Sequence, residues 1–249
     1  MRVKVVILAA GQGKRFKSPL PKVLAPVGSK PMVTWVVDAV KKSGVTDRPL
    51  VVVGVGAEQV KAALGDGCDY VFQQGQLGTG HAVLQCKSLL EGKADAVLVL
   101  YGDHPLMTAA TVAALVRTHR EQQPTLTMGT VTVQDFNAWR QPFRQFGRIK
   151  RDSTGTLLEV VEMKDATPAE LAITEINPAY FCFDASWLWP HLEQLSNHNA
   201  QGEYYLTDLV AMAVGEGRRV ATVSIPPREA LGVNSPQELE AIQTARMQW

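Results

Sequence analysis

Short apolar segments alternate with helix-like segments through the first half of the chain. Residues 3–8 and 50–55 are runs of mostly β-branched residues, which is typical of strands buried on both faces of a sheet. Residues 70–72, 94–101 and 126–133 predict further strands. Helical patterns follow Pro31 and span residues 58–64, 79–90 and 108–122, the last with Thr108 as its cap. Because such alternation implies right-handed βαβ crossovers, the sequence predicts an α/β fold with a doubly wound, mostly parallel sheet of the Rossmann-like kind.

The second half of the chain is less regular. Residues 134–146 form a polar and aromatic loop, and residues 147–151 and 156–162 flank a turn signal and predict a hairpin. Further elements are predicted as strands at residues 173–183 and 220–225, a helix at 204–216, and a last helix that starts with Ser235, Pro236 and Glu238. No linker or repeat is visible, so residues 1–249 are interpreted as one domain, regular to about residue 133 and irregular over 134–249.

Charge and cysteine content exclude several kinds of protein. Lys and Arg total 25 and Asp and Glu 24, which gives a formal net charge of +1. A nearly neutral chain has no overall positive electrostatic field that would attract nucleic acid or an anionic membrane, and neither partner is expected. The three cysteines are scattered, which argues against a disulfide framework and a structural zinc site. No apolar run approaches the ~18 residues of a membrane span, so a cytoplasmic protein is expected.

A glycine-rich loop follows the first predicted strand, at the sheet edge where ligands bind in doubly wound folds. Gly11 and Gly13 let backbone N–H groups approach phosphate oxygens. The dinucleotide fingerprint fails because Phe16 stands at its third glycine. The stiff, proline-containing return could bring Arg15 and Lys22 to one anion, although a solvated basic loop is the alternative.

Two further segments carry candidate chemistry. Gln73 precedes the start of a predicted helix, and its amide offers the donor and acceptor that suit the edge of a pyrimidine. A plain loop with Thr79 as the helix cap is the alternative, and His81 is interpreted as structural. Asp103 ends an apolar strand beside a glycine, where one hard oxygen ligand next to phosphates could hold Mg²⁺. The alternative is a cap of the next turn, and His104 is also interpreted as structural.

In this order, the segments resemble the sugar-nucleotide pyrophosphorylase family, above all its bacterial N-acetylglucosamine-1-phosphate uridyltransferases. Residues 76–82 and 199–208 carry the most specific resemblance, which extends from residue 5 to about residue 239. It implies a Mg²⁺-dependent enzyme that joins UTP and N-acetylglucosamine 1-phosphate into UDP-N-acetylglucosamine and releases pyrophosphate. These two small molecules are the expected partners, and a homo-oligomer is compatible with the sequence.

The resemblance also implies roles for individual residues. Lys22, Arg15 and Asp103 would be catalytic, and Asp103 and Asn234 would hold Mg²⁺. The nucleotide would contact Leu8, Ala9, Gly11, Gln73, Gly78, Thr79, Tyr101 and Gly102. The sugar phosphate would contact Gly147, Glu162, Asn177 and Asn234.

The sequence departs from the family in three places. Asn177, Pro178 and Ala179 stand where the family has Asn-Thr-Gly, Lys14 stands where Thr is common, and the loop of residues 134–146 is longer. Bifunctional relatives continue into a hexapeptide-repeat acetyltransferase domain that has no counterpart in this sequence, so a free-standing enzyme or a part of a longer one is expected. The alternatives are a nucleotidyltransferase for another sugar or base and a non-catalytic sugar-nucleotide sensor. The broken glycine fingerprint disfavours a nicotinamide dehydrogenase.

Overall fold

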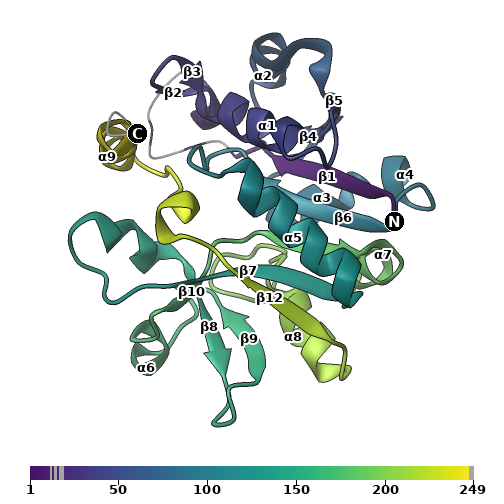
Figure 1. The fold of residues 1–249 in the computed structure, drawn as a ribbon, viewed down its shortest axis with the longest axis vertical. Helices are drawn as coiled ribbons and strands as arrows, with labels where there is room; N and C mark the ends of the chain where they lie inside the picture. The colour runs from purple at the N-terminus through teal and green to yellow at the C-terminus, as the bar shows by residue number, and fades with distance from the viewer. Residues whose placement is uncertain (12, 14–15, 17–19, 247–249) are drawn as a thin grey trace.

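The computed structural model describes residues 1–11, 13, 16 and 20–246, and a ten-stranded sheet with helices on both faces forms its centre (Figure 1). The strand order is β5-β4-β1-β6-β11-β7-β10-β8-β9, with β12 added on β7. The strands are β1 (Val3–Leu8), β4 (Leu50–Val53), β5 (Asp69–Phe72), β6 (Ala96–Tyr101), β7 (Leu126–Thr132), β8 (Gly147–Arg151), β9 (Leu157–Val161), β10 (Glu175–Asn177), β11 (Phe181–Asp184) and β12 (Val220–Ser224). A separate small hairpin consists of β2 (Pro26–Val27) and β3 (Lys30–Pro31).

The α/β class predicted from the sequence is confirmed. Strands β5, β4, β1 and β6 pair in parallel, and the central positions of β4, β1 and β6 are fully buried between two layers of helices, whereas β5 at the edge is partly exposed. One core lies against α1 (Met32–Lys42) and α5 (Ala109–Gln122), and the other lies against α3 (Thr79–Leu84), α7 (Ala185–Leu192) and α8 (Asp208–Gly215). The Thr108 side chain accepts a hydrogen bond from the Thr111 N–H and caps α5, as expected. The remaining helices are α2 (Ala57–Leu64), α4 (Lys87–Leu90), α6 (Pro168–Leu171) and α9 (Pro236–Arg246).

The sheet as a whole is mixed, because the second half of the chain adds antiparallel strands. The expected hairpin is present as β8 and β9. Strand β11 runs antiparallel to both β6 and β7, and β10 runs antiparallel to β7 and β8, whereas β12 returns parallel to β7. The prediction of a mostly parallel sheet therefore holds only for the first half of the chain.

The single strand expected at residues 173–183 is two strands along one edge of β7. Ile176 of β10 pairs with Val131, whereas Phe181 of β11 pairs with Met128. The chain thus advances five positions while β7 advances three, and the two extra residues form a bulge. On its other edge, β11 pairs with β6, whereas β10 pairs with β8. The sheet therefore divides at the bulge.

Two predicted helices differ in extent. Residues 79–90 form two short helices, α3 and α4, because the Cys86 N–H bonds to the carbonyl of Val83, three residues back. The helix expected from Tyr204 begins at Asp208, since the backbone of Tyr204 bonds instead to Leu77 and Gly80.

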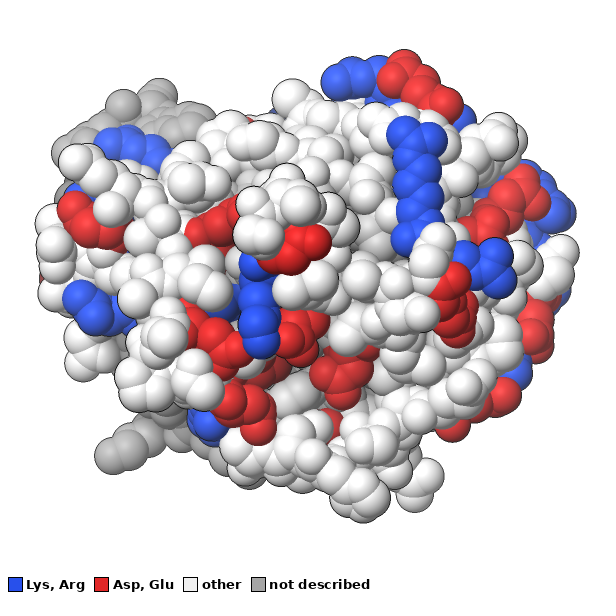
Figure 2. Space-filling model, turned by 90° about the horizontal axis from the view of Figure 1, so that it is seen from below, with Lys and Arg blue, Asp and Glu red and all other residues white. Residues whose placement is uncertain are grey.

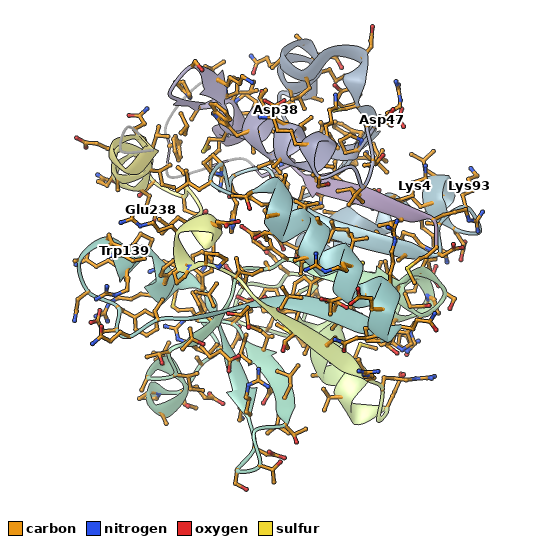
Figure 3. All side chains as sticks on the ribbon, viewed as in Figure 1. Lys4, Asp38, Asp47, Lys93, Trp139 and Glu238 are labelled. Atoms are coloured by element: carbon orange, nitrogen blue, oxygen red, sulfur yellow. The ribbon has the colours of Figure 1, made fainter. Side chains whose placement is uncertain are left out.

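The loop expected at residues 134–146 contains the 3-10 turns η3 (Ala138–Gln145). The buried guanidinium of Arg148 holds this segment by donating to backbone carbonyls, including those of Arg144 and Phe146. Trp139 lies on the outer side of the segment (Figure 3), with the guanidinium groups of Arg140 and Arg228 each 5.6 Å from its ring centre.

Surface charge and sulfur chemistry agree with the composition. On the face shown in Figure 2, basic and acidic side chains are interspersed and form no continuous basic area. Cys68, Cys86 and Cys182 are buried and unpaired. Within the described part of the chain, no helix combines the length and the apolar character needed to span a bilayer.

Candidate active site

A cavity of about 830 Å³ opens where the sheet divides. Its lining combines the ends of β1 and β6 with the start of β8, the bulge at Pro178 and Ala179, and the segment of residues 200–207. The carboxyl ends of the parallel strands β1 and β6 and the point where the sheet divides therefore face the same cavity. A ligand in this cavity can contact both halves of the chain at once.

A lysine and two side-chain oxygens meet inside the cavity. The ammonium of Lys22 lies 2.5 Å from Oδ2 of Asp103 and 2.9 Å from Oδ1 of Asn234. Pro21 precedes Lys22 at the start of a 3-10 turn, Asp103 follows β6, and Asn234 precedes α9. Three distant parts of the chain thus bring one cation and two oxygen donors together.

Burial and the neighbouring ammonium act in opposite directions on Asp103. Only 12% of the Lys22 side chain and 14% of the Asp103 side chain are exposed. Burial is the largest single influence and favours the neutral carboxyl, but the charge and hydrogen bond of Lys22, together with smaller contributions from His104 and the backbone, outweigh it, and the pKa of Asp103 is lowered. The carboxylate therefore stays ionised and carries a negative charge into the cavity.

The two oxygen donors fit a hard divalent cation. The buried Oδ1 atom of Asp103 has no hydrogen-bond partner in the part of the chain that the structure describes, which leaves it available as a ligand. Among the described residues, no group of three or more His, Cys, Asp or Glu side chains is suited to a metal. Mg²⁺ usually takes one or two protein oxygens and completes its shell with water and substrate phosphates, so a pair such as Asp103 and Asn234 suffices.

A buried hydrogen-bonded chain supports Asp103 from behind. Nδ1 of His104 lies 2.8 Å from the hydroxyl of Tyr180, which donates to the backbone carbonyl of Glu229. Burial lowers the pKa of His104, which keeps the imidazole neutral despite the nearby carboxylate. The Val233 N–H also donates to the carbonyl of Asp103 and links this wall to the segment before Asn234.

The nucleotide-side residues predicted from the sequence lie along one wall. Leu8, Gly11 and Tyr101 come from the ends of β1 and β6, and Gln73, Gly78 and Thr79 come from the loop before α3. Gly78 has φ +109°, and a Cβ there would lie 2.6 Å from the carbonyl oxygen of Tyr204, so only glycine fits. The hydroxyl of Thr79 accepts from the Leu206 N–H and so connects two segments; it does not cap α3, as the alternative interpretation of this loop would require.

The sugar-side residues predicted from the sequence line the same cavity. Oε1 of Glu162 accepts from the Thr207 hydroxyl at 2.9 Å, and burial raises the pKa of Glu162. Oδ1 of Asn177 accepts from the Ala179 N–H at 2.9 Å. A Cβ on Gly147 would lie 2.8 Å from a methyl carbon of Val160, so this wall also admits only glycine there.

Most of the site residues predicted from the sequence line this single cavity. They are Leu8, Gly11, Lys22, Gln73, Gly78, Thr79, Tyr101, Asp103, Gly147, Glu162, Asn177 and Asn234. Ala9 and Gly102 lie beneath it: Ala9 packs in the core, and the Gly102 N–H donates to the carbonyl of Leu8. Arg15 and Lys14 lie outside the described residues. The roles assigned to all these residues stay predictions.

Sequence reasoning missed several cavity residues. Gln76 donates to the carbonyl of Ala10 and closes the nucleotide wall. Lys164 adds a second ammonium, which donates to Oε1 of Gln201, and Thr207 holds Glu162. Gln76 and Thr207 lie in the segments of most specific resemblance, residues 76–82 and 199–208, whereas Lys164 lies outside them, and nothing in the pattern distinguishes the three from surface polar residues.

Known proteins resemble this chain over most of its length. Residues 5–214 match the family described as MobA-like NTP transferase domain. The chain is 45% identical over 239 residues to the bifunctional protein GlmU of Brevibacillus brevis, which covers 96% of this chain and 50% of that protein. It is 47% identical over 230 residues to the bifunctional protein GlmU of Geobacillus sp. strain WCH70, which covers 92% and 48%. The chain thus spans about half the length of these curated relatives.

Solved structures share the fold at low identity. A UDP-glucose pyrophosphorylase complexed with UDP-glucose gives a TM-score of 0.75 at 17% identity and covers 100% of this chain and 99% of that one. A putative glucose-1-phosphate thymidylyltransferase from Bacillus anthracis, in complex with sucrose, gives 0.75 at 20% identity and covers 98% and 94%. Because the family match extends over residues 5–214, the chain belongs to the MobA-like NTP transferase family.

Proposed function

We propose that the protein is a sugar-1-phosphate uridylyltransferase. It would convert UTP and N-acetylglucosamine 1-phosphate into UDP-N-acetylglucosamine and pyrophosphate. The observation that carries this proposal is the contact of Lys22 with both Asp103 and Asn234 inside the cavity. A cation held between two oxygen donors, in a cavity that is also lined by the residues predicted to bind the nucleotide and the sugar, suits a reaction between two phosphorylated molecules.

The reaction needs charge neutralisation more than a general base. A sugar 1-phosphate has its second pKa near ~6 and is already a dianion at pH 7. One of its oxygens would form a bond to the α-phosphorus of UTP while the bond from that phosphorus to the bridging oxygen breaks. That bridging oxygen leaves with pyrophosphate. Lys22 would hold the negative charge that builds up on the departing group.

Mg²⁺ is proposed as the cofactor, held by Oδ1 of Asp103 and Oδ1 of Asn234. When bound, the ion would draw charge from phosphate oxygens and reduce the repulsion between the two substrates. The residues would position the substrates in line, since phosphoryl transfer depends chiefly on orientation and electrostatics.

The nucleotide and the amino sugar are supported by similarity to relatives. The 45% identity to a bifunctional protein GlmU and the fold shared with a UDP-glucose pyrophosphorylase both favour a uridine nucleotide and a sugar phosphate. Glu162 and Asn177 would bind sugar hydroxyl or amide groups. Pro178 and Ala179 alter that wall relative to the family, so sugar choice is the part of the proposal that most needs a direct assay.

The test is pyrophosphate release with Mg²⁺ across a substrate panel. UTP, CTP, ATP and dTTP are each paired with the 1-phosphates of N-acetylglucosamine, glucose and galactose. The highest kcat/KM is expected for UTP with N-acetylglucosamine 1-phosphate. A preference for another pair would replace the substrate assignment, and tight UDP-sugar binding without any turnover would indicate a sensor in place of an enzyme.

A further inference from the structure

A histidine behind the nucleotide wall contacts two glutamines through its two ring nitrogens. Nδ1 of His81 lies 3.0 Å from Nε2 of Gln73, and Nε2 of His81 lies 3.1 Å from Nε2 of Gln85. The amide of Gln73 also donates to the carbonyl of Gly78 at 3.2 Å, and that of Gln85 donates to the carbonyl of His81 at 3.1 Å. Both amides therefore turn their N–H₂ groups toward the imidazole.

A neutral imidazole can accept only one of these two hydrogen bonds. One ring nitrogen carries a proton, so it opposes an N–H donor, and the other accepts. Gln73 is 4% exposed, whereas Gln85 is partly exposed and can exchange its ring contact for water. Leaving a buried N–H donor without an acceptor costs more free energy than leaving one that water can reach. The ring nitrogen that accepts is therefore Nδ1, which faces Gln73. His81 then carries its proton on Nε2 and keeps Nδ1 bare.

This assignment fixes which atom of Gln73 faces a ligand. Its two N–H donors are used by Gly78 and His81, which leaves Oε1 with no partner among the described residues. Gln73 lines the cavity, so Oε1 is the atom available to a base. Uracil presents an N3–H donor there, whereas cytosine presents a bare N3 that the oxygen would repel.

We propose that His81 is a positioning residue that selects uracil over cytosine by holding the Gln73 amide in one orientation. The inference rests on the proposed function, because it assumes that the base lies against Gln73. His81 itself does not touch the nucleotide. Without its bare Nδ1, the Gln73 amide would keep only the bond to Gly78 and could turn its N–H₂ group toward N3 of cytosine.

The test compares kcat/KM for UTP and CTP in three variants. His81→Phe keeps an aromatic ring but removes the acceptor, and the UTP-to-CTP ratio is expected to fall about tenfold, as for one misplaced hydrogen bond. His81→Asn can offer Oδ1 near the position of Nδ1 and is expected to restore most of the ratio. Gln85→Leu, the matched control, removes the other ring contact without touching Gln73 and should leave the ratio unchanged.

Three results would overturn the inference. They are an unchanged UTP-to-CTP ratio in a folded His81→Phe protein (whether or not both activities fall), a failure of His81→Asn to differ from His81→Phe, and a fall of the ratio in Gln85→Leu as large as in His81→Phe. The tautomer gives a readout that does not depend on turnover: ¹⁵N NMR of the imidazole should show a bare Nδ1 and a protonated Nε2, and the reverse would refute the arrangement. If the wild-type protein does not prefer UTP, the proposed function fails, and the NMR result alone decides whether His81 orients Gln73.

Discussion

Lys22 occupies the position that a divalent cation would need between Asp103 and Asn234. Its ammonium contacts one oxygen of each side chain, while Oδ1 of Asp103 stays without a partner. Two positive charges cannot share these atoms without strong repulsion. If the proposed Mg²⁺ binds at Asp103 and Asn234, its binding must therefore be coupled to a displacement of the Lys22 ammonium.

Replacing Lys22 by methionine is expected to have opposite effects on metal binding and on turnover. Loss of the competing ammonium should tighten Mn²⁺ binding without nucleotide by about tenfold, because close charge repulsion disappears. Turnover should fall ~10²-fold, the order expected when one well-placed charge is removed from a transition state. Electron paramagnetic resonance titration with Mn²⁺ and a pyrophosphate assay measure the two effects. Lys164→Met, which removes a cavity lysine bonded to Gln201, should leave Mn²⁺ binding unchanged.

The bulge between β10 and β11 places an alanine in a conformation that suits glycine. Ala179 has φ +63°, and left-handed backbone costs an L-residue about 1–2 kcal/mol. Ala179→Gly should therefore raise the free energy of unfolding by about 0.5–1 kcal/mol, after the extra chain entropy of glycine is subtracted. Urea unfolding with an unchanged m-value measures the gain. Ala114→Gly in the middle of α5 should have the opposite sign, and a loss at both positions would contradict the argument.

At the scale of elements, strands buried on both faces were predictable and the break between β10 and β11 was not. Every position of β4 is buried, and a continuous run of apolar residues records that directly. Residues 173–183 likewise predict a strand, but the sequence does not divide it into the two strands that form. The break arises because β10 and β11 have different outer neighbours, β8 and β6, and no local pattern encodes a change of neighbour.

The start of α8 illustrates the same limit on prediction. The helical pattern includes Tyr204, but the Tyr204 N–H bonds to Leu77 and its carbonyl accepts from Gly80, more than a hundred residues away in the sequence. Long-range backbone bonds override local propensity. Similarly, motifs indicated Gln73, Asp103 and Lys22 as candidates, whereas the contacts of Lys22 with Asp103 and of His81 with Gln73 become evident only in the structure.

The first residue of α8 should make stability depend on pH. Burial, with help from the carboxylates of Asp165 and Glu159, raises the pKa of Asp208 to about 6. The folded protein thus binds this proton more tightly than the unfolded chain, whose aspartates titrate near ~3.9. The contribution of Asp208 to stability is therefore full below pH ~4 and is lost as the pH rises through 6.

Asp208→Asn should remove this dependence. At pH 7.5 the variant should be more stable than the wild type by about 1 kcal/mol, a value reduced because the side chain is partly exposed. At pH 4 the two proteins should have equal unfolding free energies. Thermal or urea unfolding at both pH values measures the difference. Asp47→Asn, at an exposed position labelled in Figure 3, should change nothing at either pH, and a pH-independent gain in Asp208→Asn would contradict the titration argument.

At the scale of the whole molecule, the cavity joins segments from both ends of the chain. Lys22 and Asn234 are separated by 212 positions in the sequence, yet their side chains are 2.9 Å apart. The order of motifs placed both residues in one site by resemblance, and the fold explains how they meet. The division of the sheet opens the cavity, and the link from Val233 to Asp103 brings the segment before α9 to its edge.

A ligand that contacts both halves must stabilise the folded state as a unit. At a concentration of 100 times its Kd, a ligand that binds only the folded protein adds about 2.7 kcal/mol. UTP with Mg²⁺ should therefore raise the unfolding midpoint more than UTP with a chelator does.

In Asn234→Ala the extra increment due to Mg²⁺ should shrink, because one proposed ligand is gone, while the effect of UTP alone should persist. Ser235→Ala is the matched control: the Ser235 hydroxyl accepts from the Glu238 N–H, so its loss should lower basal stability by about 1 kcal/mol but keep the Mg²⁺ increment. Equal Mg²⁺ increments in Asn234→Ala and the wild type would remove Asn234 from the metal site.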